Sequence, residues 1–127
     1  MTGLGDTVLM PKPGQETAHL WIIVTAPEAG SGQAVMVNLT TQRPHSDTTV
    51  VLNAGDHPFV RHPTVVNFSD ARFVDVRQLE QGIRAGYFAA QATCTARVLQ
   101  RIQAGVLASQ FTPTKIKTYC RTAALSP

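Results

Sequence analysis

The residues best suited to chemistry in this chain are its four histidines, His19, His45, His57 and His62. An imidazole has an ordinary pKa of about 6.5, so near neutral pH it can accept a proton as a general base or release one as a general acid. Arginine complements histidine, because its guanidinium fork binds two oxygens of a phosphate. His45 is expected to be an exposed residue without a role.

The loop at residues 57–63 is one place where these residue types meet in the sequence. It contains two prolines, which restrict its backbone, and loops that a scaffold holds rigid often carry catalytic residues. This loop would present His57, Arg61 and His62 to a ligand. The alternative is structural: Asp56 and His57 cap backbone groups in a turn.

A metal site is an alternative chemistry for the same residues. Asp56, His57 and His62 could supply three ligands and His19 a fourth. Their spacing, however, matches no recognised metal motif. We therefore expect no metal and no other cofactor.

The two cysteines, Cys94 and Cys120, do not indicate a nucleophile. Cys94 falls on the apolar stripe of an expected helix, where a small buried residue is the ordinary explanation, and Cys120 is expected to be exposed near the C-terminus. The two lie far apart and form no Cys-x-x-Cys pair. This pattern is typical of a reduced protein of the cytoplasm.

Short strands separated by turn residues are expected over the first ninety residues. Runs rich in β-branched and aromatic residues predict strands at 7–10, 19–25, 34–41, 48–52, 64–68 and 71–76. The strand at 19–25 is apolar without a break, which predicts burial on both faces. Trp21 and Phe68 are expected in the core. A short helical turn is expected at 75–81.

The period of the apolar residues changes in the last third of the chain. From about 90 to 109 they fall at spacings of three and four, which predicts an amphipathic α-helix. Gly105 would be a weak point there, roughly 1 kcal/mol less favourable than alanine. Residues 113–127 are expected to be a loosely held, polar and basic tail. We expect one domain at 1–112, mainly β (α+β), with short strands in a small barrel and one C-terminal helix.

Composition and charge leave the class of partner open. The chain has 127 residues, of which 43% are hydrophobic and 15% charged, as in one folded domain. No apolar run approaches the ~20 residues of a membrane span and no secretory signal is visible, so we expect a cytoplasmic protein. Residues 1–60 hold two basic and five acidic side chains, whereas residues 61–127 hold nine and three. The basic half permits contact with nucleic acid without requiring it.

The order of these elements, together with four segments, resembles the MazF/PemK family of plasmid-maintenance growth inhibitors over about residues 3–110. The segments are Gly-Asp-Thr-Val-Leu at 5–9, Leu-Trp-Ile-Ile-Val at 20–24, Val-Met-Val-Asn-Leu-Thr-Thr at 35–41 and the run at 64–79. The resemblance implies an SH3-like barrel with a C-terminal helix, a homodimer and an antitoxin partner. It implies a ribosome-independent RNA endonuclease in many relatives, while other relatives with this barrel poison DNA gyrase.

The resemblance also implies site residues. His19 stands where the ribonucleases have an arginine ahead of the second strand, and Thr40 stands where they have a threonine at the end of the third. Some members carry Arg-x-Asp where residues 67–69 read Asn-Phe-Ser, so both charges are missing here. The expected catalytic residues are His19 and Thr40, which the resemblance implies, and His57, which the loop at 57–63 indicates. The expected substrate-binding residues are Thr41, Arg61, His62, Asn67 and Ser69.

Two functions from different classes follow from these residues. The first is a toxin-like, metal-independent endoribonuclease that cleaves single-stranded RNA. The second is a non-catalytic binding module on the same barrel, with a degenerate site, that binds an antitoxin, gyrase or nucleic acid. An unrelated small β-protein with a structural role is a third interpretation.

Overall fold

The computed structural model describes residues 2–122. Its elements are β1 (Thr7–Pro11), β2 (Ala18–Ile23), the 3-10 helix η1 (Pro27–Gly30), β3 (Gln33–Thr41), β4 (Val51–Leu52), β5 (Thr64–Asp75), α1 (Val76–Arg84), β6 (Ala89–Gln91), α2 (Ala96–Ala108) and α3 (Thr114–Thr122). Most strands lie in the predicted β-branched runs. The exception is β6, which has no β-branched residue and forms by pairing with β1. Within residues 2–122, no helix has the length and apolar character needed to cross a membrane.

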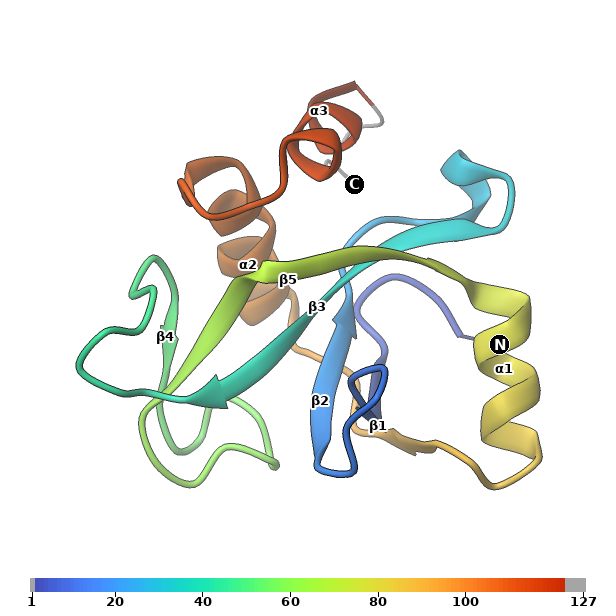
Figure 1. Ribbon diagram of the computed structural model, residues 1–127, viewed down its shortest axis with the longest axis horizontal. Helices are drawn as coiled ribbons and strands as arrows, with labels where there is room; N and C mark the ends of the chain where they lie inside the picture. Colours follow the sequence, from blue (N-terminus) through green and yellow to red (C-terminus); the bar gives the residue numbers. More distant parts are fainter. Residues whose placement is uncertain (1, 123–127) are drawn as a thin grey trace.

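The six strands form one antiparallel sheet in the order β4-β5-β3-β2-β1-β6. Figure 1 shows that the sheet is strongly curled, with the long strands β3 and β5 crossing its middle and α2 and α3 lying together apart from α1. The predicted class, a small barrel-like antiparallel sheet followed by a helix, is confirmed. The curl makes a half-barrel, because β4 and β6 remain at its two edges.

Helices cover both faces of the curled sheet, which explains the unbroken apolar run around β2. Leu20, Ile22 and Val24 join a large core cluster that includes residues of α2 and α3. Trp21 and Ile23 point the other way, into a smaller cluster with residues of α1. All five side chains are fully buried, so the predicted burial on both faces is confirmed.

A bulge in β5 stands where the sequence predicted a break between two strands. Met36 of β3 pairs with Arg72 of β5, and Asn38 pairs with Asn67. Between these pairs β3 has one residue, Val37, whereas β5 has the four residues 68–71, so the pairing register shifts. A bulge bends its strand and re-aims the side chains it contains. Here it allows the carboxylate of Asp70 to accept a hydrogen bond of 3.1 Å from the amide of Asn38 across the sheet.

Helix α2 begins at Ala96 and not near residue 90. The hydroxyl of Thr95 caps the helix by accepting a hydrogen bond of 3.2 Å from the N–H of Val98. Residues 90 and 91, which the prediction placed in the helix, belong to β6. The helix is therefore shorter at its N-terminus than the apolar period predicted, while its end at Ala108 agrees with the prediction.

Gly105 is buried at the point where α2 crosses the sheet, which corrects its interpretation as a weak point. A Cβ at this position would lie 2.5 Å from Cζ of Phe68 and 2.7 Å from Cγ2 of Val50. Real Cβ atoms do not approach other carbons so closely. The close approach of the helix to β5 therefore requires a glycine, whatever its intrinsic helix propensity.

The prediction of a loosely held tail at 113–127 is wrong for Thr114–Thr122, which form α3. Ile116 and Cys120 are each 1% exposed and join the large core cluster. Two apolar residues at a spacing of four are a helical signal, but the surrounding polar residues masked it. The folded domain thus extends to at least Thr122. Residues 123–127 lie outside the described residues.

Both thiols lie in surroundings that make them unreactive. Burial raises the pKa of the Cys94 thiol to about 11, and it raises the pKa of the Cys120 thiol to about 11 as well. At pH 8 the reactive thiolate is then roughly 100-fold rarer than in a free cysteine. We expect both to react with a thiol reagent at least about 100-fold more slowly in the native protein than in denaturant. Rapid labelling of either thiol in the native protein would contradict this burial.

Candidate functional site

Two pockets lie next to each other on the sheet, and Thr40 near the end of β3 lines both. The first, here called the histidine pocket, has about 340 Å³ and is lined by Thr17, Ala18, His19, Leu39, Thr40, Thr41, Arg43, Phe59, His62 and Thr64. The second, here called the Asn67 pocket, has about 250 Å³ and is lined by Thr40, His45, Ser46, Asp47, Val65, Asn67, Ser69 and Phe111. Together they gather every expected site residue except His57 and Arg61.

His19 lies in β2 at the wall of the histidine pocket. Trp21 of β2 pairs with Asn38 of β3, and continuing this register by two residues on each strand brings His19 beside Thr40. Nδ1 of His19 lies 3.2 Å from the carbonyl oxygen of Leu39. Since a carbonyl oxygen only accepts, the neutral ring carries its proton on Nδ1. Its Nε2 then has a free lone pair, which is the form that a general base needs.

His62 reaches the same pocket from the loop between β4 and β5. Its Nε2 lies 3.1 Å from the hydroxyl of Thr41. The N–H of Gln42 donates to the carbonyl of Pro63 at 3.1 Å, which ties this loop to the end of β3. Arg43, exposed just after β3, adds a guanidinium. The pocket therefore combines two imidazoles with hydroxyl groups and a permanent cation.

His57, which was expected to be catalytic, lies outside both pockets and is 4% exposed. Its Nε2 lies 2.6 Å from the carbonyl oxygen of Ala92, and its Nδ1 accepts a hydrogen bond of 3.0 Å from the N–H of Phe59. Asp56 likewise accepts from the N–H of Asn53 at 2.8 Å. Both ring nitrogens of His57 are therefore occupied by backbone groups. These contacts are the ones that the structural alternative expects, and the burial of His57 separates it from the side chains of both pockets.

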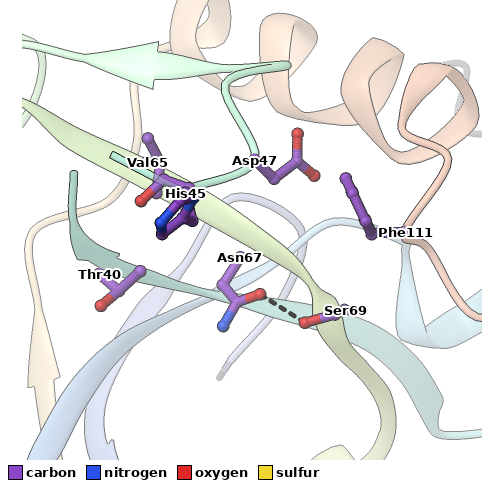
Figure 2. Close-up of a pocket in the computed structure, with 8 residues that line it drawn as sticks. Thr40, His45, Asp47, Val65, Asn67, Ser69 and Phe111 are labelled. Carbon is purple, nitrogen blue, oxygen red and sulfur yellow. Dashed lines mark hydrogen bonds between the residues drawn. The ribbon is translucent and has the colours of Figure 1, made fainter. Parts of the chain in front are cut away.

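The Asn67 pocket, drawn in Figure 2, shares Thr40 with the histidine pocket. Asn67 and Ser69 come from β5, and the amide oxygen of Asn67 accepts a hydrogen bond of 2.6 Å from the hydroxyl of Ser69. His45 comes from the loop between β3 and β4, and Phe111 from the connection between α2 and α3. Figure 2 shows these two rings on opposite sides of the pocket. Its walls thus come from segments that lie far apart in the sequence.

A partly buried network behind the Asn67 pocket fixes the amide of Asn67. Oδ2 of Asp70 accepts hydrogen bonds from Nδ2 of Asn67 at 3.0 Å and from Nδ2 of Asn38 at 3.1 Å, and it pairs with the ammonium of Lys12. Burial raises the pKa of Asp70, but hydrogen bonds from Lys12 and Asn38 and the charges of Lys12 and Arg72 outweigh it. The pKa of Asp70 therefore lies below its ordinary value, and the carboxylate is ionised at neutral pH.

Replacing Asp70 by asparagine should lower the free energy of unfolding by about 1 kcal/mol at pH 7, because hydrogen bonds to a charged acceptor become bonds to a neutral one. The pKa of Asp70 is lowered in the folded state, so its charge stabilises the fold above the ordinary pKa and this contribution fades as pH falls through the folded value. Urea unfolding of both proteins at pH 7 and at pH 3–4 should show the difference narrowing in acid. Glu16→Gln, which removes an exposed carboxylate, is the matched control; an Asp70→Asn difference that is independent of pH would contradict the account.

The residues considered as metal ligands are not brought together. Within residues 2–122, no three side chains of His, Cys, Asp or Glu lie close enough to hold one ion. Asp56 accepts from a backbone N–H and lies 3.7 Å from Arg101, while both nitrogens of His57 are occupied. The groups that line the histidine pocket, two imidazoles, hydroxyls and a guanidinium, are of the types that transfer protons and bind anions.

Arg43, His45 and Phe111 line the pockets, although the sequence analysis assigned them no role. Arg43 follows the end of β3 closely, and a cation next to Thr40 and Thr41 was a usable signal for anion binding. The sequence around Phe111 does not indicate a binding residue, because only the tertiary packing of α2 brings Phe111 near β5. Arg61, which was expected to bind substrate, is exposed and lines neither pocket.

Comparison with solved structures finds this fold in toxin–antitoxin proteins. An endoribonuclease in complex with its cognate antitoxin from Mycobacterial species matches with a TM-score of 0.58 and 17% identity, over 89% of this chain and 98% of that chain. A MazE-MazF structure from Deinococcus radiodurans matches with a TM-score of 0.56 and 14% identity, over 88% of this chain and 98% of that chain. Comparisons with protein-family models and with curated proteins give no match. The chain therefore has the MazF-like fold that the order of its elements predicted.

Proposed function

We propose that this chain is a toxin-like protein of a toxin–antitoxin system that cleaves single-stranded RNA without a metal. The histidine pocket carries the proposal, because it gathers His19, His62 and Arg43 around Thr40. His19 and Thr40 are also the positions at which the family resemblance implies an active site. A fold shared with an endoribonuclease that binds an antitoxin supports the same class. The excess of basic side chains at 61–127 suits a polyanionic substrate.

In the proposed reaction, Nε2 of His19 removes the proton from a ribose 2′-hydroxyl, and the 2′-oxygen attacks the adjacent phosphorus. The bond between phosphorus and the 5′-oxygen breaks, and protonated His62 gives its proton to that oxygen. The guanidinium of Arg43 and the hydroxyls of Thr40 and Thr41 bind the phosphate oxygens and stabilise their growing charge. The products are a 2′,3′-cyclic phosphate and a 5′-hydroxyl.

A non-catalytic binding module is the second candidate, and residues 67–69 favour it. They supply no charge where some relatives have Arg-x-Asp, and the side chains of Asn67 and Ser69 are bonded to each other. Such a module would hold RNA, gyrase or an antitoxin without turnover. It predicts binding to the same surface with no change in the ligand.

We propose an antitoxin as the protein partner, as in the complexes named for the two matched structures. An apolar groove of about 460 Å³ suits an extended or helical segment of such a partner. Its charged lining residues are Lys12, which pairs with Asp70, Arg72 and Asp75. The groove is formed mainly by Met10, Trp21, Met36, Leu79 and Phe88. Co-expression of a small acidic protein encoded beside this one should relieve toxicity, and failure to bind it would contradict the proposal.

We also propose a homodimer, which the family resemblance implies. Sedimentation or light scattering of the purified protein should give the mass of two chains. A mass of one chain at micromolar concentration would contradict the homodimer. It would leave the proposed cleavage mechanism unchanged.

Inducible expression in bacteria tests the proposed function, with growth and total RNA followed together. Cleavage predicts growth arrest with discrete RNA fragments. Arrest with intact RNA would favour gyrase or another protein target, and therefore the binding module. Normal growth with soluble, folded protein would contradict the toxin proposal.

A further inference from the structure

We propose that His57 is a positioning residue for the cleavage reaction. It ties the loop at residues 53–63, between β4 and β5, to the segment that joins β6 to α2, and this tie holds His62 in the histidine pocket. His57 itself is buried and lines neither pocket, so it does not touch the substrate. This inference rests on the proposed function, in which His62 is the acid that protonates the leaving oxygen.

The ring of His57 makes one hydrogen bond inside its loop and one across the molecule. Its Nδ1 accepts from the N–H of Phe59 at 3.0 Å, and its Nε2 lies 2.6 Å from the carbonyl oxygen of Ala92. Since a carbonyl oxygen only accepts and a backbone N–H only donates, the ring carries its proton on Nε2. In this tautomer histidine offers an acceptor and a donor on two sides of one rigid ring, and both are used.

The segment that His57 reaches is itself fixed against β1. The carbonyl of Ala92 also accepts a hydrogen bond of 2.7 Å from the hydroxyl of Thr7, a buried residue of β1. Two residues further on, the N–H of Cys94 donates to the carbonyl of Gly5 at 2.9 Å. His57 therefore joins its loop to a part of the backbone that the sheet holds in place.

The other end of the loop forms a wall of the histidine pocket. Phe59 and His62 both line that pocket. The N–H of Val60 donates to the carbonyl of His57 at 2.9 Å, and the side chain of Val60 is buried in the large core cluster, so the chain turns at His57 before it reaches the pocket. His62 is exposed, and its Nε2 lies 3.1 Å from the hydroxyl of Thr41.

An exposed side chain has little packing of its own to hold it, so the place of His62 depends on the backbone of this loop. The rate of a proton transfer is sensitive to such placement, because a shift of about 1 Å can lower a rate by about 100-fold. Loss of the bond between His57 and Ala92 should therefore slow the reaction although no reacting group is removed.

Two amide substitutions separate the two hydrogen bonds of His57 in single-site RNA cleavage. His57→Asn keeps an oxygen that can accept from the N–H of Phe59 but does not reach Ala92, and it should lower kcat by about 10- to 100-fold with KM unchanged. His57→Gln is long enough to donate to Ala92, and it should keep kcat close to the wild-type value. It should also keep both limbs of the pH–rate profile, because an amide takes no part in proton transfer.

A double variant shows whether His57 acts through His62. In a His62→Asn background, His57→Asn should cause no further loss of kcat, because the group that it positions is already gone. Amide hydrogen exchange at residues 57–63 should be faster in His57→Asn than in the wild-type protein. Thr25→Val is the control for lost stability: it removes a buried hydrogen bond of 2.8 Å from the N–H of Val35, beyond the end of β2 that lies away from His19, and should leave kcat unchanged.

The outcomes distinguish this role from the proposed function. Losses that multiply in the double variant, a His57→Gln protein as slow as His57→Asn, or unchanged hydrogen exchange at 57–63 would overturn the positioning role and leave the nuclease proposal standing. If His57→Asn does not fold, the pH–rate profile of His57→Gln decides, since a lost limb would make His57 itself the acid or the base. A wild-type protein that cleaves no RNA would overturn both proposals.

Discussion

Replacing His19 by asparagine should lower the rate of RNA cleavage by about 10²- to 10⁴-fold, the usual contribution of a general base. Asparagine is the informative replacement, because its Nδ2 can donate to the carbonyl of Leu39 as Nδ1 of His19 does in the structure. The backbone contact is kept and only the basic nitrogen is lost. We therefore expect the melting temperature to change little while kcat falls. Single-turnover cleavage of a labelled RNA measures this directly.

Arg61→Gln is the matched control for His19→Asn. Arg61 lies beside His62 in the chain and is exposed, but it lines neither pocket, so its loss should leave the rate close to that of the wild-type protein. His62→Asn should reduce the rate as His19→Asn does, because it removes the proposed acid. A His19→Asn protein that is folded and cleaves at the wild-type rate would show that the base is another group.

Replacing Gly105 by alanine should lower the free energy of unfolding by up to about 3 kcal/mol, although helix propensity alone predicts a gain of about 1 kcal/mol. The added methyl would lie 2.5 Å from Cζ of Phe68 and 2.7 Å from Cγ2 of Val50, both in the core. The helix or the ring must shift to admit it. Denaturant unfolding of the two proteins measures the sign and the size of the change.

A second substitution separates this packing effect from any other cause. Phe68→Leu shortens the side chain that the new methyl would meet, so the double variant should be more stable than the sum of the two single changes predicts. Ala104→Gly, at an exposed position of the same helix, is the control for propensity alone. A Gly105→Ala protein more stable than the wild type would contradict the close approach of α2 to β5.

The fold was predictable to the extent that local patterns decide it. β-branched runs marked β1, β2 and β3, and the apolar period marked α2. The sequence analysis predicted two strands where β5 is one. The polar residues 69–70 resemble a turn in the sequence, but in the structure they lie in a bulge within the strand. Helix α3 was missed, since only Ile116 and Cys120 of its residues are buried and the rest of its sequence is polar.

The positions of the site residues on strands could be predicted from the sequence, whereas the positions of those on loops could not. His19 and Thr40 were indicated by the family resemblance, and β2 and β3, which pair at Trp21 and Asn38, bring both to the histidine pocket. His57 and His62 lie in one loop with similar local sequence, and only tertiary contacts separate them. His57 turns inward to the carbonyl of Ala92, whereas His62 remains at the surface beside Thr41. The hydrophobic pattern of the sequence does not show which of the two histidines is buried.

The ends of the RNA fragments test the central claim most directly. Purified protein is incubated with a short single-stranded RNA in excess EDTA, and the products are weighed by mass spectrometry beside those from the same RNA with a 2′-deoxy nucleotide at the cleaved position. The account predicts a 2′,3′-cyclic phosphate and a 5′-hydroxyl in EDTA, and no cut at the 2′-deoxy position. Cleavage that requires a metal, that proceeds at the 2′-deoxy position or that leaves a 5′-phosphate would contradict a histidine mechanism in this pocket.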